Sequence, residues 1–212
     1  MSLALTTRRL ALIGTASLLL GSVAFAQSPA APAAPPLRLR ATIEKVEPGS
    51  ITVKERSGEV ITLVLASNLT VSEVYAIDIA DIKPGSYVGS AAMPQADGTL
   101  KALEVLVFPE AMRGTGEGHR GWDLMPQSTM TNATVDQVAV GGSAGSRTLV
   151  LKYKDGAKTL AVPPEAPIVT FKPGDATLLV VGAKLLITAE VKDGKPTATR
   201  ITAGRNGFAP PM

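Results

Sequence analysis

The residues with the greatest potential for chemistry lie together in one glycine-rich stretch, residues 113–123 (RGTGEGHRGWD). It contains the only histidine of the chain, His119, and the only tryptophan, Trp122. Arginine and tryptophan are the side chains that most often anchor interfaces. We therefore expect Arg113, Arg120 and Trp122 to contact a ligand, a partner or a neighbouring domain.

The glycines of this stretch also suggest a phosphate-binding loop. Such a loop follows a strand and opens a helix whose N-terminal amides face the anion. Here Pro126 follows shortly after Asp123, which disfavours an immediate helix, and the stretch has no lysine. We therefore expect an interdomain linker or tight turn, with a defined ligand or partner contact as the alternative.

A hydrolase is one alternative for this stretch, because His119 could act as a base that Asp123 orients. Nucleophilic catalysis also needs an activated hydroxyl and a pocket for the oxyanion. Three hydroxyl residues lie nearby, but no motif marks any of them as a nucleophile; they are Thr115, Ser128 and Thr129. We therefore expect no catalytic residue and no enzyme.

A soft-metal site is a second alternative. Met112, His119, Met125 and Met130 fall within nineteen residues, and monovalent copper or silver accepts thioether and imidazole ligands. Zinc is disfavoured because the chain has one histidine and no cysteine. Methionine also commonly fills gaps in a core, so we expect no firm metal site and no cofactor, with copper as the exception to test.

The first residues have the features of an export signal. Arg8 and Arg9 precede an apolar run over residues 10–20, and Ala24 and Ala26 form a small-x-small cleavage signal. We therefore expect a signal peptide over residues 1–26, a Pro/Ala tether over residues 27–36 and a periplasmic or secreted protein. Export by the Sec or by the twin-arginine route stays open.

Composition excludes several classes of function. Residues 1–26 carry two arginines and no acidic residue, so the remaining chain has 19 basic and 18 acidic residues. Its charge is therefore nearly balanced. Aromatic residues are scarce, at 4%, so we expect no nucleic-acid partner. The chain has no cysteine, which excludes disulfides and thiolate sites. No apolar run after the signal is long enough to span a membrane.

Alternation of apolar and polar residues predicts an all-β protein from residue 37 onward. Residues 51–54 and 61–65 read as a hairpin, and Asp97-Gly98 reads as a second hairpin turn. Residues 78–82 predict a short helical element, where Asp78 and Asp81 act as caps rather than as calcium ligands with Glu73.

The pattern of residues 37–112 recurs in the same order over residues 129–207, which indicates a domain duplication. Ala133–Val138 corresponds to Ala41–Val46, for example, and Ala198–Ile201 corresponds to Ala102–Val105. We expect two tandem small antiparallel β-barrels (OB-like), each with a short helical segment, a Gly-rich junction over residues 113–128 and a tail over residues 208–212. A sandwich of two short sheets is the alternative.

The first unit resembles a family of small bacterial exported β-barrel domains of unknown function. The resemblance is carried by "ITVKERSGEV", "DIKPGSYV" and "DGTLKALEV", and by "MRGTGEGHRGWDL" at the junction. It covers the chain after the tether, although the second unit has "LVVGAKLLI" where the Lys-Pro-Gly would stand. The resemblance implies an OB-like fold and a periplasmic setting, and it implies no catalytic residue.

These observations together predict an exported, non-catalytic binding or scaffold module. Its ligand or partner is an unidentified small molecule or periplasmic protein, and its oligomeric state stays open. The residues that we expect at the interdomain or ligand junction are Arg113, His119, Arg120, Trp122 and Asp123.

Overall fold

The computed structural model describes residues 36–142 and 144–210, which belong to one compact unit. The expected signal peptide and nearly all of the expected tether lie outside the described residues. Strands dominate the described part, and its only helices are three short 3-10 turns, so the all-β expectation is confirmed. None of the helices in residues 36–142 and 144–210 has the length and apolar character that crossing a membrane requires.

The strands follow one another in this order: β1 (Leu37–Glu47), β2 (Ser50–Glu55), β3 (Val60–Ala76), β4 (Tyr87–Pro94), β5 (Leu100–Ala102), β6 (Val105–Val107), β7 (Gly118–Gly121), β8 (Thr129–Val140), β9 (Arg147–Tyr153), β10 (Gly156–Val162), β11 (Ile168–Pro173), β12 (Lys184–Lys192) and β13 (Lys195–Gly204). The 3-10 helices are η1 (Ile79–Asp81), η2 (Glu110–Met112) and η3 (Ala176–Leu178).

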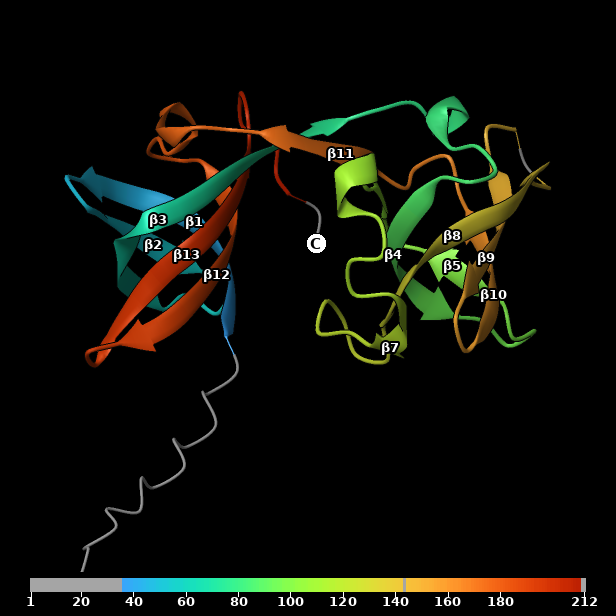
Figure 1. Ribbon diagram of the computed structural model, residues 1–212, viewed down its shortest axis with the longest axis horizontal. Helices are drawn as coiled ribbons and strands as arrows, with labels where there is room; N and C mark the ends of the chain where they lie inside the picture. The colour runs from blue at the N-terminus through green and yellow to red at the C-terminus, as the bar shows by residue number, and fades with distance from the viewer. Residues whose placement is uncertain (1–35, 143, 211–212) are drawn as a thin grey trace, which may run out of the picture. The chain divides into compact units, whose positions relative to one another are not determined.

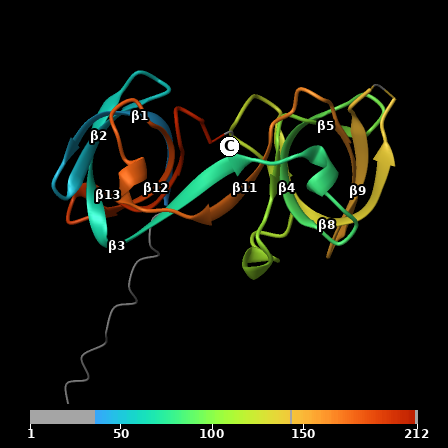
Figure 2. The same ribbon diagram turned by 90° about the horizontal axis from the view of Figure 1, so that it is seen from above.

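Five strands close into a barrel, which we call ring 1, in the order β1-β2-β3-β13-β12 and back to β1. The β3–β13 pair is parallel and the other four pairs are antiparallel. Figure 2 shows these strands encircling a common interior. Closure removes the unpaired sheet edges that a short open sheet would expose. The alternating apolar residues fill the interior, among them Ile43, Ile51, Val53, Leu63, Ile187 and Ile201.

A second set of pairings, which we call ring 2, repeats this order. It runs β8-β9-β10-β5-β4 and back to β8. Its β10–β5 pair is parallel, at the same position as the parallel pair of ring 1. Its buried apolar residues include Val88, Val135, Leu149, Leu151 and Leu160.

Each ring takes strands from both halves of the chain. Ring 1 combines β1, β2 and β3 with β12 and β13, whereas ring 2 combines β8, β9 and β10 with β4 and β5. Figure 1 shows this as blue and teal strands grouped with red strands, and green strands grouped with yellow and orange ones. The pairings therefore do not confirm one barrel for residues 37–112 and another for residues 129–207. The last two strands of each ring therefore come from the other half of the chain: β12 and β13 complete ring 1, and β4 and β5 complete ring 2. We call this arrangement the strand exchange.

The exchange runs through two connections that pair with each other. The far end of the 17-residue strand β3 pairs antiparallel with β11, and both views show the two segments side by side (Figures 1 and 2). In ring 2 the counterpart of β3 is broken into β10 and β11 around Pro163, Pro164 and Pro167. Proline cannot donate a ladder hydrogen bond, so it interrupts a strand there.

Local signals in the sequence specify the predicted turns. The expected helical element is the single 3-10 turn η1, and Asp78 and Asp81 form a capping box around it. Glu73 does not join them. It is buried on β3 and pairs with Lys172 at 3.2 Å and with Arg205 at 2.8 Å, so its charge stabilises the crossing of β3 and β11.

The exchange predicts that neither half of the chain folds alone. A fragment of residues 36–112 would contain only three strands of ring 1, and its β4 and β5 would lack their partners β8 and β10. We expect fragments 36–112 and 113–212 to lack cooperative unfolding separately and to form a 1:1 complex with restored strand signal when mixed. Far-UV circular dichroism and size-exclusion chromatography measure this, with the intact chain as the reference. A fragment that unfolds cooperatively as a monomer would contradict the exchange.

Candidate functional site

The glycine-rich junction is an ordered edge of the sheet rather than a free linker. Residues Gly118–Gly121 form β7, which pairs antiparallel with the start of β8. Gly114, Gly116 and Gly118 have φ angles of 83°, 58° and 124°, a region that residues with a Cβ rarely adopt. The glycines therefore let the chain turn back onto β8 directly before β7.

The pleat of β7 and β8 separates the predicted residues into two faces. Arg120 stands opposite Met130, whereas His119 stands opposite Thr131. Successive side chains of a strand point to opposite faces of the sheet. Arg120 and Met130 therefore share one face with Asn132, and His119 shares the other face with Thr131.

The face of Arg120 looks onto a cavity of about 490 Å³, which lies within the range of small-ligand pockets. Strands of ring 1 provide one wall through outward side chains that alternate with buried core residues. The junction, β6, β8 and β11 provide the rest. The residues that line the cavity are Arg38, Thr70, Ser72, Leu106, Phe108, Met112, Thr115, Gly116, Arg120, Trp122, Met130, Asn132, Phe171, Leu186, Thr188, Arg200 and Thr202.

Three arginines make the cavity cationic, and none of the described residues that line it is acidic. The guanidinium of Arg38 lies 4.8 Å from the Trp122 ring centre, and that of Arg120 lies 5.7 Å from it. Partial burial lowers the pKa of Arg120, and the charge of Arg38 lowers that pKa further. The guanidinium groups of Arg38 and Arg200 form no ion pair or hydrogen bond with the residues that the structure describes.

Two buried polar atoms of the cavity-lining residues have no partner among the described residues. They are Nε1 of Trp122 and Oδ1 of Asn132. The amide nitrogen of Asn132 donates to the carbonyl oxygen of Thr115 at 2.9 Å, so Asn132 fastens the turn before β7 to β8. A buried polar atom without a partner is costly, and such atoms are concentrated at functional sites.

An ion pair connects the junction to ring 1. Arg40 of β1 binds both carboxylate oxygens of Asp123, at 3.0 and 3.3 Å. The hydrogen bonds from Arg40 hold the pKa of Asp123 below its ordinary value. Because Asp123 directly follows Trp122, this pair fixes the position at which the indole meets Arg38.

Glu104 is affected by the charge of Arg40 and is almost fully buried, with 1% exposure. Both of its carboxylate oxygens lack partners among the described residues. Burial raises its pKa to about 8, against the opposing charge of Arg40. Burial therefore favours the neutral, protonated form of Glu104 in the folded protein.

The structure places the other predicted residues apart from the cavity. Arg113 binds Glu110 at 2.6 Å and donates to the Gly85 carbonyl oxygen at 2.9 Å, and it does not line the cavity. Met125 is exposed. Of the predicted set, Met112, Arg120, Trp122 and Met130 line the cavity.

His119 is not arranged with Asp123, because its Nδ1 lies 2.8 Å from the Thr131 hydroxyl while Asp123 binds Arg40. Partial burial and the charges of Lys158 and Arg120 lower the pKa of His119, which favours the neutral ring of a base. Its hydroxyl partner Thr131 is fully buried, with 0% exposure. A substrate in the cavity would therefore not reach that hydroxyl.

The four residues of the predicted soft-metal set are also divided. Met112 and Met130 line the cavity, His119 is on the opposite face of the β7–β8 pair, and Met125 is in neither place. The described residues contain no group of three or more histidine, cysteine or acidic side chains that could hold a metal ion.

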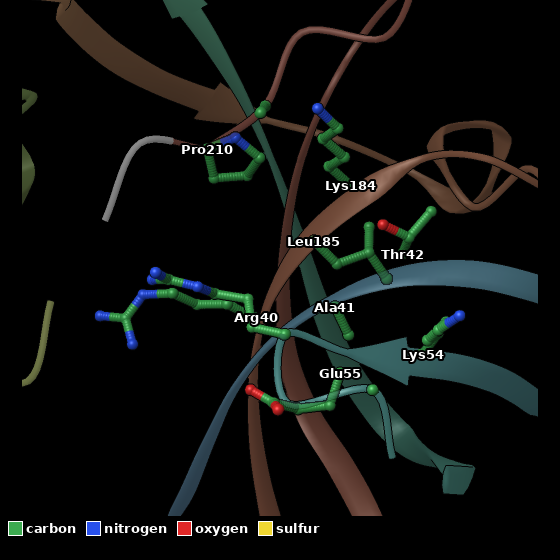
Figure 3. Close-up of a pocket in the computed structure, with 11 residues that line it drawn as sticks. Arg40, Ala41, Thr42, Lys54, Glu55, Lys184, Leu185 and Pro210 are labelled. Carbon is green, nitrogen blue, oxygen red and sulfur yellow. The ribbon is translucent and has the colours of Figure 1, made fainter. Parts of the chain in front are cut away.

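A second hollow, lined in part by β1 and β2, has less chemical definition. It measures about 410 Å³ and is lined by Arg40, Lys54, Glu55, Lys184 and the tail residues Ala209 and Pro210, among others. Figure 3 shows Arg40 extending away from Lys54, so the basic side chains do not converge there. Glu55 also lines this hollow, which offsets its positive charge.

No protein-family model, curated protein or solved structure matches this chain. The resemblance to exported β-barrel domains of unknown function therefore stays a prediction.

Sequence reasoning missed Arg38 and Arg200, which complete the cationic cavity. Both occupy ordinary polar positions of alternating strands, so their types carried no signal. The sequence Leu37-Arg-Leu-Arg40 does place two arginines on one face of a strand. That pairing was the one available indication of a basic face on β1.

Asn132 and Phe108 pack closely against Gly89 of β4, and this contact generates a prediction. An added Cβ at Gly89 would meet Asn132 Oδ1 at 2.8 Å and Phe108 Cε2 at 3.0 Å. We expect Gly89→Ala to lower the free energy of unfolding by about 1–3 kcal/mol, measured by urea denaturation. Gly121→Ala is the control, because an added Cβ there meets nothing within 4 Å. Equal stability of the two variants would contradict the packing.

Burial of Glu104 generates a pH prediction. Because its folded pKa is raised from 4.5 to about 8, the folded state binds more protons than the unfolded state between these values. The free energy of unfolding should therefore fall as pH rises from about 4.5 to about 8. We expect Glu104→Gln to remove this slope and to be more stable than the parent above pH 8, by roughly 1–3 kcal/mol. Urea denaturation across this pH range measures the effect, with the exposed Glu59→Gln as the control. If the free energy of unfolding depends on pH equally in Glu104→Gln and in the parent, the prediction is wrong.

Proposed function

We propose that this protein is an exported, non-catalytic binding module that captures a small ligand in the cavity around Trp122. The observation that carries the proposal is the cavity itself. It has the volume of a small-ligand site, apolar walls, and a tryptophan whose indole nitrogen is buried without a partner among the described residues. A concave, largely apolar surface with a few fixed polar groups is the usual form of a ligand site.

The division of His119 from Asp123 and the burial of Thr131 support binding without turnover. A nucleophilic mechanism requires the nucleophile, its base and the substrate to meet at one point. The residues of this junction do not offer that arrangement, so the hydrolase alternative lacks a supporting observation.

We also infer that both rings are OB-like barrels. Each set of five strands closes in the same order, with a short helical turn before its fourth strand. A five-stranded barrel of this kind commonly binds ligands on its outer face and loops. The wall that ring 1 contributes to the cavity consists of such outward side chains.

A neutral apolar probe tests the proposed function without assuming the charge of the ligand. We expect N-phenyl-1-naphthylamine to bind the mature chain, residues 27–212, saturably and with 1:1 stoichiometry. The fluorescence of the probe measures this. Thr188→Phe places a ring in the cavity and should weaken binding roughly tenfold or more. Trp122→Ala should also change the affinity, because the indole forms one wall.

Thr159→Phe is the matched control, because Thr159 is an exposed mid-strand position on β10 outside the cavity. We expect it to leave probe binding unchanged. Circular dichroism verifies that each variant is folded. Equal binding by the parent, Thr188→Phe and Thr159→Phe would show that the probe binds elsewhere and would contradict the proposed function.

A further inference from the structure

We infer that the cavity around Trp122 binds an oxyanion joined to an apolar body, with the oxyanion held by Arg38, Arg120 and Arg200. The inference rests on the proposed function, because it names the chemical class of the ligand of the same cavity. The oxyanion is a carboxylate or a phosphate, and the apolar body is an alkyl chain or an aromatic ring system.

The positive charge of the cavity has no acidic counterpart among the described residues that line it. Three guanidinium groups line one cavity, and no described acidic side chain lines it with them. Other arginines of the chain do have carboxylate partners: Arg40 binds Asp123, Arg113 binds Glu110 and Arg205 binds Glu73. Unlike these three, the cavity arginines have no acidic partner among the described residues.

Two of these cations lie against one aromatic ring. Arg38 and Arg120 both lie within 6 Å of the Trp122 ring centre, so their like charges are held near each other. Cation–π contact with an indole offsets part of that repulsion. An anion bound between them would offset more, and guanidinium forms two-pronged hydrogen bonds with carboxylate and phosphate.

Much of the remaining wall is apolar. It comes from β6, the residue that follows it, β8, β11 and β12, through Leu106, Phe108, Met130, Phe171 and Leu186. A bare inorganic anion would leave this surface without contact. Burial of apolar surface contributes roughly 25 cal/mol per Å², so an apolar body attached to the oxyanion adds affinity that the charge alone does not supply.

The cavity wall also carries hydroxyl residues, namely Thr70, Ser72, Thr188 and Thr202. Hydroxyls donate to or accept from polar atoms at the border of a ligand and carry no charge of their own. The wall thus combines cationic, hydroxyl and apolar groups, which complements a molecule that is anionic at one end and apolar over its remainder.

A matched ligand series tests the inference on the mature chain. The ligands are n-octyl phosphate, n-octanoate, n-octanol, 4-phenylbutyrate and inorganic phosphate, each followed by Trp122 fluorescence and by isothermal titration calorimetry. We expect octyl phosphate and octanoate to bind 1:1 and about tenfold or more tighter than octanol and inorganic phosphate. Their affinity should fall as salt rises from low to 0.5 M, because salt screens exposed charges.

Comparison of octanoate with 4-phenylbutyrate shows whether the cavity prefers an alkyl chain or an aromatic ring as the apolar body.

Arg200→Gln is the decisive variant, because Arg200 is exposed and makes no ion pair with described residues. It should weaken octanoate binding roughly tenfold. Arg56→Gln removes the same charge from an exposed position outside the cavity and should leave binding unchanged.

The outcomes separate this inference from the proposed function. Octanol that binds as tightly as octanoate, or equal affinities for Arg200→Gln and Arg56→Gln, would overturn the oxyanion while leaving a binding cavity in place. Inorganic phosphate that binds as tightly as octyl phosphate would overturn the apolar body. Binding of the neutral naphthylamine probe with no binding of any anion overturns this inference alone, and binding of neither overturns both.

Discussion

Closure of each ring depends on two strands that the other half of the chain supplies. Ring 1 closes only because β13 pairs with β3 and β12 pairs with β1, and ring 2 closes only through β4 and β5. A three-stranded piece of either half would expose two unpaired edges, which proteins avoid. The antiparallel pair of β3 and β11 then satisfies the backbone of the two crossing connections. The buried Glu73, with Lys172 and Arg205, joins three segments at that point.

The cavity is a consequence of this arrangement, because strands from both halves contribute to its wall. The inward residues of ring 1 fill its core, and the same alternation turns Arg38, Thr202 and Arg200 outward. β7 adds Arg120 to this surface, and the Arg40–Asp123 pair holds Trp122 beside Arg38. Charge, an aromatic wall and apolar surface therefore meet at one place although none of the strands concerned carries a recognisable binding motif.

Local sequence signals were sufficient for the elements, because a strand, a turn or a cap depends on neighbours in the chain. The hairpin of β2 and β3 and the capping box of Asp78 and Asp81 follow from such signals. The choice of partner strands does not follow from local signals. Each strand has a similar candidate partner in either half of the chain, and the periodicity of the sequence does not distinguish the two candidates. For the site, the rarity of Trp122 drew attention to the junction, and the structure places Trp122 in the wall of the cavity. The pleat of β7, which separates His119 from Arg120, and the contribution of Arg200 from a distant strand required the pairing register.

Disulfide trapping tests the strand exchange most directly, since the chain contains no cysteine of its own. Ser72 of β3 pairs with Thr202 of β13, and both line the cavity. Under oxidising conditions, the double variant Ser72→Cys/Thr202→Cys should form one intramolecular disulfide, measured by intact mass before and after reduction. Tandem barrels would instead place Ser72 beside Leu106, the counterpart of Thr202 in the first half. Failure of the first pair together with efficient bonding of Ser72→Cys/Leu106→Cys would contradict the exchange.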